Sequence, residues 1–244
     1  MNLDQEKNII DAIRKCQRNW DLSRDIPQDH IDHFISIAKT APSKQDESYF
    51  NLYVITNKTL ILELLDFTWG HTLELIPGLL TGVTRNTQMG ANSYFLFTAK
   101  PPIDVREVEN TGYNFRKADP RRKRNAYLSI GIASALIARS AAELGYKTGF
   151  NSNHAYHTEA PWREKLGIGE HEEIVVGLGV GFPQPERERN EHDETEFLIG
   201  EDKITRYNTN DSTVMINGQE HPMPQIVYRT YSQIQKDILI KKFD

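Results

Sequence analysis

The stretch from residue 30 to residue 55 constrains the fold most, because a helix, a loop and a strand follow one another there. Four apolar residues repeat at the i, i+3, i+4, i+7 spacing of a helix face: Ile31, Phe34, Ile35 and Ala38. Pro42 ends this helix, since the residue before a proline avoids helical backbone. The apolar residues 50–56 then predict a strand. A helix followed so closely by a strand favours a mixed architecture of helices and sheet.

The rest of the chain continues this mixture of elements. We expect further helices ending near Arg14 and over residues 59–69, 125–144 and 159–166, and strands over residues 93–98, 146–150 and 173–180. The Gly- and Thr-rich residues 70–90 are expected to be irregular, and the Asn217-Gly218 turn favours a small hairpin. We therefore expect one α+β domain over residues 1–190 and an extended C-terminal tail over residues 191–244, packed on the domain or on a partner subunit.

The helix expected over residues 125–144 is the longest and is rich in small residues. Gly131, Ala133, Ser134 and Ala135 allow another helix to approach closely. We expect this helix to be buried at a subunit interface.

Composition excludes several classes of protein. The 244 residues carry a net charge of −5, which gives no general electrostatic case for nucleic-acid binding. Cys16 is the single cysteine, so an internal disulfide is excluded and a reducing compartment fits. The N-terminus is charged where a signal peptide needs an apolar run, and no apolar stretch reaches the roughly 18–20 residues of a membrane helix. We expect a cytoplasmic protein with no membrane partner.

Two basic clusters lie far apart in the sequence. Arg14, Lys15 and Arg18 surround Cys16, and Arg187 and Arg189 lie near the other end of the expected domain. Each cluster alone is more often a solvated charged surface, but guanidinium groups offer paired N–H donors that match phosphate oxygens. Together the clusters suggest a site for a phosphorylated planar cofactor.

The order of these motifs resembles that of the nitroreductase family, whose cofactor is FMN. The family's first helix ends in a basic motif, matched here by residues 14–18, and an Ala-Pro-Ser step follows, matched by Ala41-Pro42-Ser43. The strand SYFLFTAKP, the helix ending in ELGY, the strand EIVVGLGVGFP and the pair Arg187-x-Arg189 continue the likeness. It covers about residues 8–190.

The resemblance implies a nitroreductase-like α+β fold, with a central antiparallel or mixed sheet flanked by helices, in a homodimer with FMN at the subunit interface. It also implies that NAD(P)H reduces FMN, which then reduces a nitroaromatic, quinone or similar small acceptor. No side chain is assigned a catalytic role. The residues implied to hold FMN are Arg14, Lys15, Cys16, Arg18, Arg187 and Arg189 at the phosphate, Pro42, Ser43, Lys44 and Asp46 along the ring's polar edge, Arg85 at the pyrimidine edge, and Ser152 and Asn153 near N5 and O4.

Several positions depart from the family pattern. Cys16 replaces a serine, Asp46 lies near the usual loop asparagine, and Tyr49-Phe50 replaces Pro-Trp. Arg85 aligns near the asparagine that usually faces the flavin pyrimidine edge, with Asn86 one residue away. An arginine there would favour the anionic reduced flavin, whereas the simpler interpretation is a surface arginine.

Other motifs have simpler interpretations. Gly177-x-Gly179-x-Gly181 runs on into Phe182-Pro183 and not into a helix, so it favours a closely packed strand over a dinucleotide-binding turn. His154 and His157 lack the accompanying ligands of a metal site. Residues 121–124 are four consecutive cations, typical of a solvated loop or a subunit contact. Cys16 has no histidine nearby in sequence to make it a nucleophile.

Three alternatives to an ordinary nitroreductase stay open at this point. One is a specialised branch, a reductive dehalogenase or a flavin-fragmenting enzyme. Another is an FMN-binding protein without turnover. The third is an FMN-free interaction protein on the same fold.

Overall fold

The computed structural model describes residues 2–14, 16–18, 20–68, 72–76, 80–84, 86–100, 120–152, 159–183, 194–198, 204–208, 213–216 and 219–222. Its helices are α1 (Leu3–Arg14), α2 (Gln28–Thr40), α3 (Lys58–Leu65), α4 (Pro120–Glu143) and α5 (Glu159–Leu166), with short 3-10 turns η1 (Lys44–Asp46) and η2 (Thr87–Met89). Its strands are β1 (Phe50–Ile55), β2 (Thr72–Ile76), β3 (Leu80–Thr84), β4 (Ser93–Ala99), β5 (Lys147–Asn151), β6 (Glu173–Gly181), β7 (Glu194–Leu198), β8 (Ile204–Asn208), β9 (Thr213–Ile216) and β10 (Gln219–Pro222). The expected α+β class is confirmed.

The main sheet has the strand order β1-β4-β6-β5, and every pair is antiparallel. Ala99 pairs with both Phe50 and Glu173 at one end, called here the Glu173 end. Lys147 pairs with Gly181 at the opposite end, called here the Gly181 end. Seven residues of β4 separate the two ends, which is about 20 Å at the rise of an antiparallel strand.

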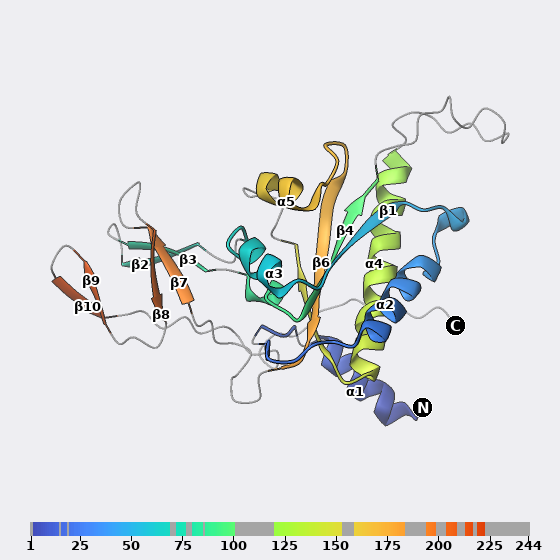
Figure 1. Ribbon diagram of the computed structural model, residues 1–244, viewed down its shortest axis with the longest axis horizontal. Coiled ribbons are helices and arrows are strands. Elements are labelled where there is room, and N and C mark those ends of the chain that lie inside the picture. Colours follow the sequence, from blue (N-terminus) through green and yellow to red (C-terminus); the bar gives the residue numbers. More distant parts are fainter. Residues whose placement is uncertain are drawn as a thin grey trace, which may run out of the picture.

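The main sheet lies between two layers of helices (Figure 1). Side chains of β4 alternate between the layers, as period-two geometry requires. Phe95 and Phe97 pack with α2 and α4, whereas Tyr94 and Leu96 pack with α3 and α5. Every residue of β4 is therefore buried, which explains its continuous apolar sequence.

Local chemistry sets the helix boundaries. Pro27 precedes α2, and α2 ends at Thr40, two residues before Pro42. The Asn57 side chain accepts a hydrogen bond from the Leu60 backbone at 3.1 Å and caps α3. Gly145, at φ +85°, adopts the left-handed conformation that closes the C-terminus of α4.

Two expectations about the chain were wrong. α4 begins at Pro120 and not at residue 125, so the four cations at 121–124 lie in its first turns and not in a loop. Residues 70–90 are not irregular throughout, because β2 and β3 pair with each other there. The remaining boundaries shift by a few residues, most of all for α3, which ends at Leu65.

A second sheet has the order β2-β3-β7-β8 and is also antiparallel. It joins residues 72–84 to residues 194–208, and Figure 1 draws it on the α3 side of the main sheet, away from α4. The hairpin expected around Asn217-Gly218 is confirmed, since β9 pairs with β10. Among the described ranges, no helix is long and apolar enough to cross a membrane.

Candidate functional site

The loop after α1 lies against β5 at the Gly181 end. The Gln17 backbone N–H donates to the Thr148 carbonyl at 2.8 Å, and Gln17 is buried. Gly149 permits this contact, because a Cβ there would lie 2.7 Å from the Gln17 carbonyl oxygen. Cys16 and Arg18 on either side are half-buried. The backbone of this loop is therefore fixed to the sheet while its flanking side chains reach the surface.

Asn86 lies just before η2 and is only 6% exposed. Its backbone N–H donates to Thr68 Oγ1 at 3.0 Å, and its Nδ2 donates to Asn151 Oδ1 at 2.9 Å. Within the described structure, the buried Oδ1 of Asn86 and the buried Oγ1 of Thr87 have no hydrogen-bond partner. Leaving such atoms without a partner costs free energy. The Thr87 hydroxyl can donate or accept, whereas the Asn86 oxygen can only accept and therefore indicates a missing donor. A ligand with an N–H group would supply it.

The end of β6 lies beside the chain that follows Arg18. Trp20 forms an antiparallel bridge with Pro183, and the Asp21 backbone N–H donates to the Phe182 carbonyl at 2.9 Å. The Trp20 indole donates to the Thr87 carbonyl at 2.8 Å, which ties the same segment to η2. The loop after α1, η2 and the exit of β6 therefore converge at the Gly181 end.

Asn92, which is 3% exposed, connects the segment after Arg18 to the end of β6 through side-chain hydrogen bonds. Its Nδ2 donates to the carbonyls of Asp21 and Arg24, at 2.8 and 2.9 Å, and its Oδ1 accepts from the Phe182 backbone at 3.0 Å. Gly181 leaves the space, since a Cβ there would lie 2.0 Å from the Asn92 oxygen. One buried amide thus satisfies three backbone groups.

The loop between α2 and β1 lies at the Glu173 end instead. Glu47 in this loop forms an ion pair with Arg122 of α4 at 3.1 Å, and the Arg122 guanidinium lies over the Tyr49 ring. α2 has 13 residues, about 20 Å of helix, and it separates this loop from the segment that contains Arg18. Pro42, Ser43, Lys44 and Asp46 are therefore not brought together with Arg18 and Asn86 within one chain.

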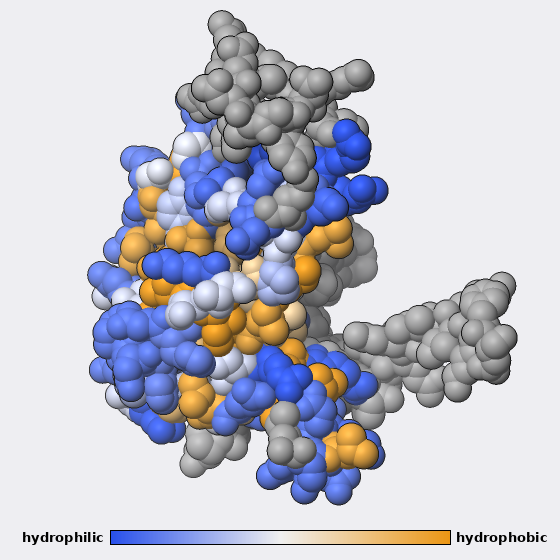
Figure 2. Space-filling view, turned by 90° about the vertical axis from the view of Figure 1, so that its right-hand side faces the viewer, coloured by the Kyte–Doolittle hydropathy of each residue, from blue (hydrophilic) through white to orange (hydrophobic). Residues whose placement is uncertain are grey.

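One face of α4 is apolar and exposed. Leu128, Ile132 and Leu136 recur every four residues with 58%, 40% and 37% exposure. Figure 2 views the molecule from the α4 side and shows apolar surface among the polar surroundings. Gly131 and Ala135 are exposed on the same helix, and nothing lies within 4 Å of where a Gly131 Cβ would be. Ala133 and Ser134, also expected at an interface, point into the chain's own core.

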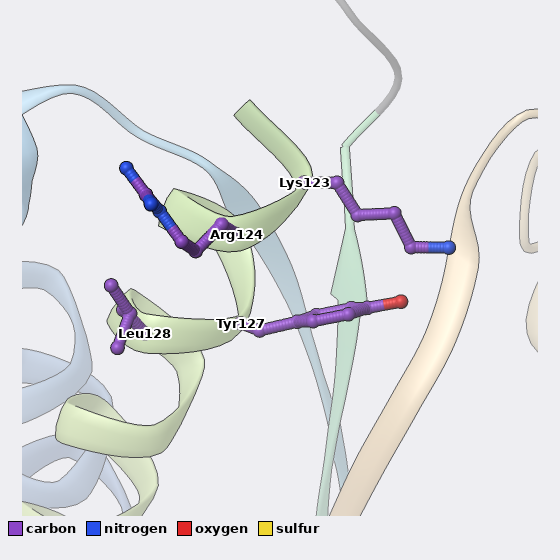
Figure 3. Close-up of a pocket in the computed structure, with 4 residues that line it drawn as sticks. All are labelled: Lys123, Arg124, Tyr127 and Leu128. Atoms are coloured by element: carbon purple, nitrogen blue, oxygen red, sulfur yellow. The ribbon is translucent and has the colours of Figure 1, made fainter. Parts of the chain in front are cut away.

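The first turns of α4 border an open groove lined by Lys123, Arg124, Tyr127 and Leu128 (Figure 3). Lys123 Nζ and the Tyr127 hydroxyl point toward β6, where they meet the Glu173 carboxylate at 3.1 and 2.6 Å. Burial and the bond to Glu173 raise the pKa of Tyr127. These contacts offset the unfavourable placement of cations at a helix N-terminus.

The structure places only part of the predicted site. Arg14 is exposed at the end of α1, 3.9 Å from Asp11, and Ser152 is exposed directly after β5. The predictions that lie outside the described residues concern Lys15, Arg85, Asn153, His154, His157, Arg187 and Arg189. No group of three or more His, Cys, Asp or Glu residues in the described ranges could hold a metal ion. Thr87 and Asn151 were not predicted from the sequence as site residues. Asn151 had a usable signal, because it is a polar residue at the end of a strand.

The family model described as "Nitroreductase family" matches residues 12–182. This chain belongs to the nitroreductase family. No protein of curated function matches its sequence. Family membership supports a flavin-dependent oxidoreductase.

Solved structures show the same fold at low sequence identity. NfrA1 nitroreductase from B. subtilis is 14% identical with a TM-score of 0.56, covering 76% of this chain and 70% of that one. B. megaterium NfrA2 is 17% identical with a TM-score of 0.55, covering 79% and 71%. The NADPH:FMN oxidoreductase from Vibrio harveyi, solved in complex with NAD+, is 16% identical with a TM-score of 0.53, covering 76% and 73%.

Proposed function

We propose that this protein is an FMN-dependent oxidoreductase that takes reducing equivalents from NAD(P)H and passes them to a small acceptor, such as a nitroaromatic or a quinone. Membership of the family and the likeness to the NADPH:FMN oxidoreductase from Vibrio harveyi support this class of reaction. FMN, when bound, would supply the redox chemistry, and the protein would supply binding and orientation.

The buried Oδ1 of Asn86 carries the proposal. It is a hydrogen-bond acceptor with no partner in the described structure, and its Nδ2 is already engaged with Asn151. The imide N–H at the pyrimidine edge of a flavin is a donor of the matching kind. Because the side chain is buried, a ligand that donates here would remove a desolvation penalty as well as gain a bond. We therefore propose that Asn86 lies at the pyrimidine edge of the flavin, in addition to the expected Arg85.

The phosphate would lie near the loop after α1. Gln17 is held to β5 through Thr148, which is three residues before Asn151, or about 10 Å along the strand. Arg18 also lies two residues before Trp20, whose indole donates to the carbonyl of Thr87, the residue after Asn86. The chain leaves β6 at Pro183 beside Trp20, and we propose that Arg187 and Arg189 complete the phosphate site from there, with Arg14 and Cys16 on the other side.

A second copy of the chain would complete the site. The Ala-Pro-Ser loop lies at the Glu173 end beside α4, whereas Asn86 bonds to Asn151, which pairs with the middle of β6, and leads into η2, which packs with α3. We therefore propose that a flavin on Asn86 meets Pro42, Ser43, Lys44 and Asp46 from a partner. The exposed apolar face of α4 supports such a pairing. We propose a homodimer in which the loop of one subunit closes the flavin site of the other.

The C-terminal residues are proposed to act beside this site. β3 ends at Thr84, two residues before Asn86, and β7 pairs with β3. Residues 191–244 are therefore proposed to form an extension that packs on the domain and supports the segment leading into η2.

The proposal can be tested on the purified protein by its absorbance, by the flavin it releases and by its reduction. Saturated protein should be yellow, with absorbance near 450 nm, and acid or heat should release FMN and not FAD. NADH or NADPH should bleach the bound flavin, and a quinone should restore its colour. Recovery of FAD, or of no flavin after saturation, would refute the cofactor assignment. Flavin that NAD(P)H does not reduce would indicate a binding protein without turnover.

A further inference from the structure

A buried line of polar side chains runs from the interior of the main sheet to Asn86. Tyr94 of β4 hydrogen-bonds through its hydroxyl to the side-chain amide of Asn151, the last residue of β5. Asn151 Oδ1 in turn accepts the hydrogen bond from Asn86 Nδ2 at 2.9 Å. Tyr94, Asn151 and Asn86 are 0%, 2% and 6% exposed. Water therefore has little access to compete for these hydrogen bonds.

Gly177 makes the connection possible. β6 lies between β4 and β5, and Gly177 pairs with Asn151 across the ladder. A Cβ at Gly177 would lie 1.8 Å from the Tyr94 hydroxyl oxygen and 2.1 Å from the ring carbon that bears it. Only glycine leaves room for the phenol to cross β6 and reach β5. One glycine of the Gly-x-Gly-x-Gly run thus has a specific role.

Burial raises the pKa of Tyr94 well above its ordinary value, against the opposing effect of the bond to Asn151, so the phenol stays protonated. The side-chain amide of Asn151, which the Tyr94 hydroxyl contacts, directs its Oδ1 toward Asn86 and accepts the hydrogen bond from Asn86 Nδ2 there. Asn86 therefore donates through Nδ2, and its Oδ1 has no partner in the described structure.

We propose that Tyr94 and Asn151 are positioning residues that fix the side-chain amide of Asn86, so that a hydrogen-bond acceptor faces the bound ligand. The inference rests on the proposed function, in which the ligand group at this point is the flavin imide N–H. Without the two residues, the Asn86 amide could rotate by half a turn and present Nδ2, a second donor, to the flavin donor.

The affinities of FMN and N3-methyl-FMN for the full chain stripped of flavin test this inference. The methyl group removes the imide donor, so the wild-type protein should prefer FMN. Tyr94→Phe removes only the hydroxyl, and Asn151→Leu removes the amide. Both should reduce the preference for FMN about fivefold or more, the effect of losing one oriented hydrogen bond. Equal losses for both flavins, or an unchanged preference in both variants, would overturn the inference.

Tyr53→Phe is the matched control. It also removes one phenol hydroxyl, here a partly buried one on the neighbouring strand β1 that bonds to Glu172 near the Glu173 end of the sheet. The control should lower stability and leave the preference for FMN unchanged.

A second measurement does not need flavin. Hydrogen exchange of the Asn86 side-chain amide, followed by NMR in the flavin-free protein, should be slow in the wild type. Tyr94→Phe and Asn151→Leu should accelerate it at least several-fold, and Tyr53→Phe should not. Unchanged exchange in both variants would overturn the inference even if FMN binds. Accelerated exchange in a protein that binds no flavin would support the positioning role and refute the proposed cofactor.

Discussion

The Arg139 guanidinium of α4 forms two parallel hydrogen bonds with the Glu6 carboxylate of α1, at 2.7 and 2.8 Å. α1 contains no fully buried residue, although Ile13 packs against the core, so this pair is one attachment of the helix that leads into the Cys16–Arg18 loop. Arg139→Lys should lose the paired geometry and weaken the attachment only slightly, because both groups are partly exposed. Hydrogen exchange of α1 amides should become faster.

Glu143→Gln is the control for that variant. Glu143 also binds Arg139, at 3.1 Å, but from within α4. Exchange in α1 should remain as in the wild type. Equal acceleration in both variants would show that the Glu6 contact does not anchor α1.

Arg18→Ala should weaken FMN binding by about 1.5–3 kcal/mol, the range for losing a hydrogen bond to a charged group. The loss should shrink at high salt, since the contact is charge-assisted. Titration with riboflavin, which lacks the phosphate, should show little difference between variant and wild type. Equal affinity for FMN would place Arg18 on a solvated surface.

Ile132→Lys should weaken dimerisation, because each dimer would place two ammonium groups in the apolar face of α4. An increase in the dimer dissociation constant of at least about tenfold is expected, the size typical of a disrupted interface core. Leu62→Lys on α3 is the control, since Leu62 is an equally exposed apolar residue away from α4. Sedimentation that reports the same dimer for both variants would contradict the α4 interface.

Thr98→Val should make the protein less resistant to acid. Burial acts to raise the pKa of Glu172, but hydrogen bonds from Thr98, Asn51, Tyr53 and the Gly169 backbone outweigh it and hold the pKa below the usual 4.5. A carboxyl group with a lowered pKa stabilises the fold above about pH 4.5 and loses that contribution as the pH falls through its folded value. Removing the Thr98 hydroxyl should raise the midpoint of acid unfolding, followed by circular dichroism. An unmoved midpoint would assign the acid transition to other groups.

Arg85→Ala should lower the midpoint potential of bound FMN, if the guanidinium lies beside the pyrimidine edge and stabilises the reduced, anionic flavin. About 30 mV corresponds to about 1.4 kcal/mol for a two-electron couple. Asn86→Ala should instead weaken FMN binding in both redox states with a smaller change in potential, because it removes a neutral acceptor. An unchanged potential in Arg85→Ala would identify Arg85 as a surface residue.

The sequence predicted best where the signal was local and periodic. The helix over residues 159–166 has the expected bounds, and the strands at residues 50–55, 93–99 and 173–181 lie within one residue of the expected ones. The early start of α4 also had a local signal, since Pro120 follows an aspartate, a pairing typical of the first helical turn. Pro77-Gly78 is likewise a turn signal in the sequence, between residues 72–76 and 80–84.

Other features had no local signal. β3 pairs with β7, more than a hundred residues away, and only the folded chain brings them together. From the sequence, Ser43 and Arg18 were predicted to belong to one site. The folded chain places them at opposite ends of the sheet, because α2 lies between them. Likewise, the link from Tyr94 to Asn86 depends on strand order and register.

The separation of Asn86 from the Ala-Pro-Ser loop has a genetic consequence. If each flavin contacts Asn86 of one subunit and Ser43 of the other, a subunit altered at Asn86 and a subunit altered at Ser43 damage different halves of each site. In a mixed dimer of these two, both lesions fall on one flavin position and the other position is intact. Two inactive alleles should therefore complement each other in one cell, recovering up to half of the sites in every mixed dimer, whereas two alleles altered on the same half should not.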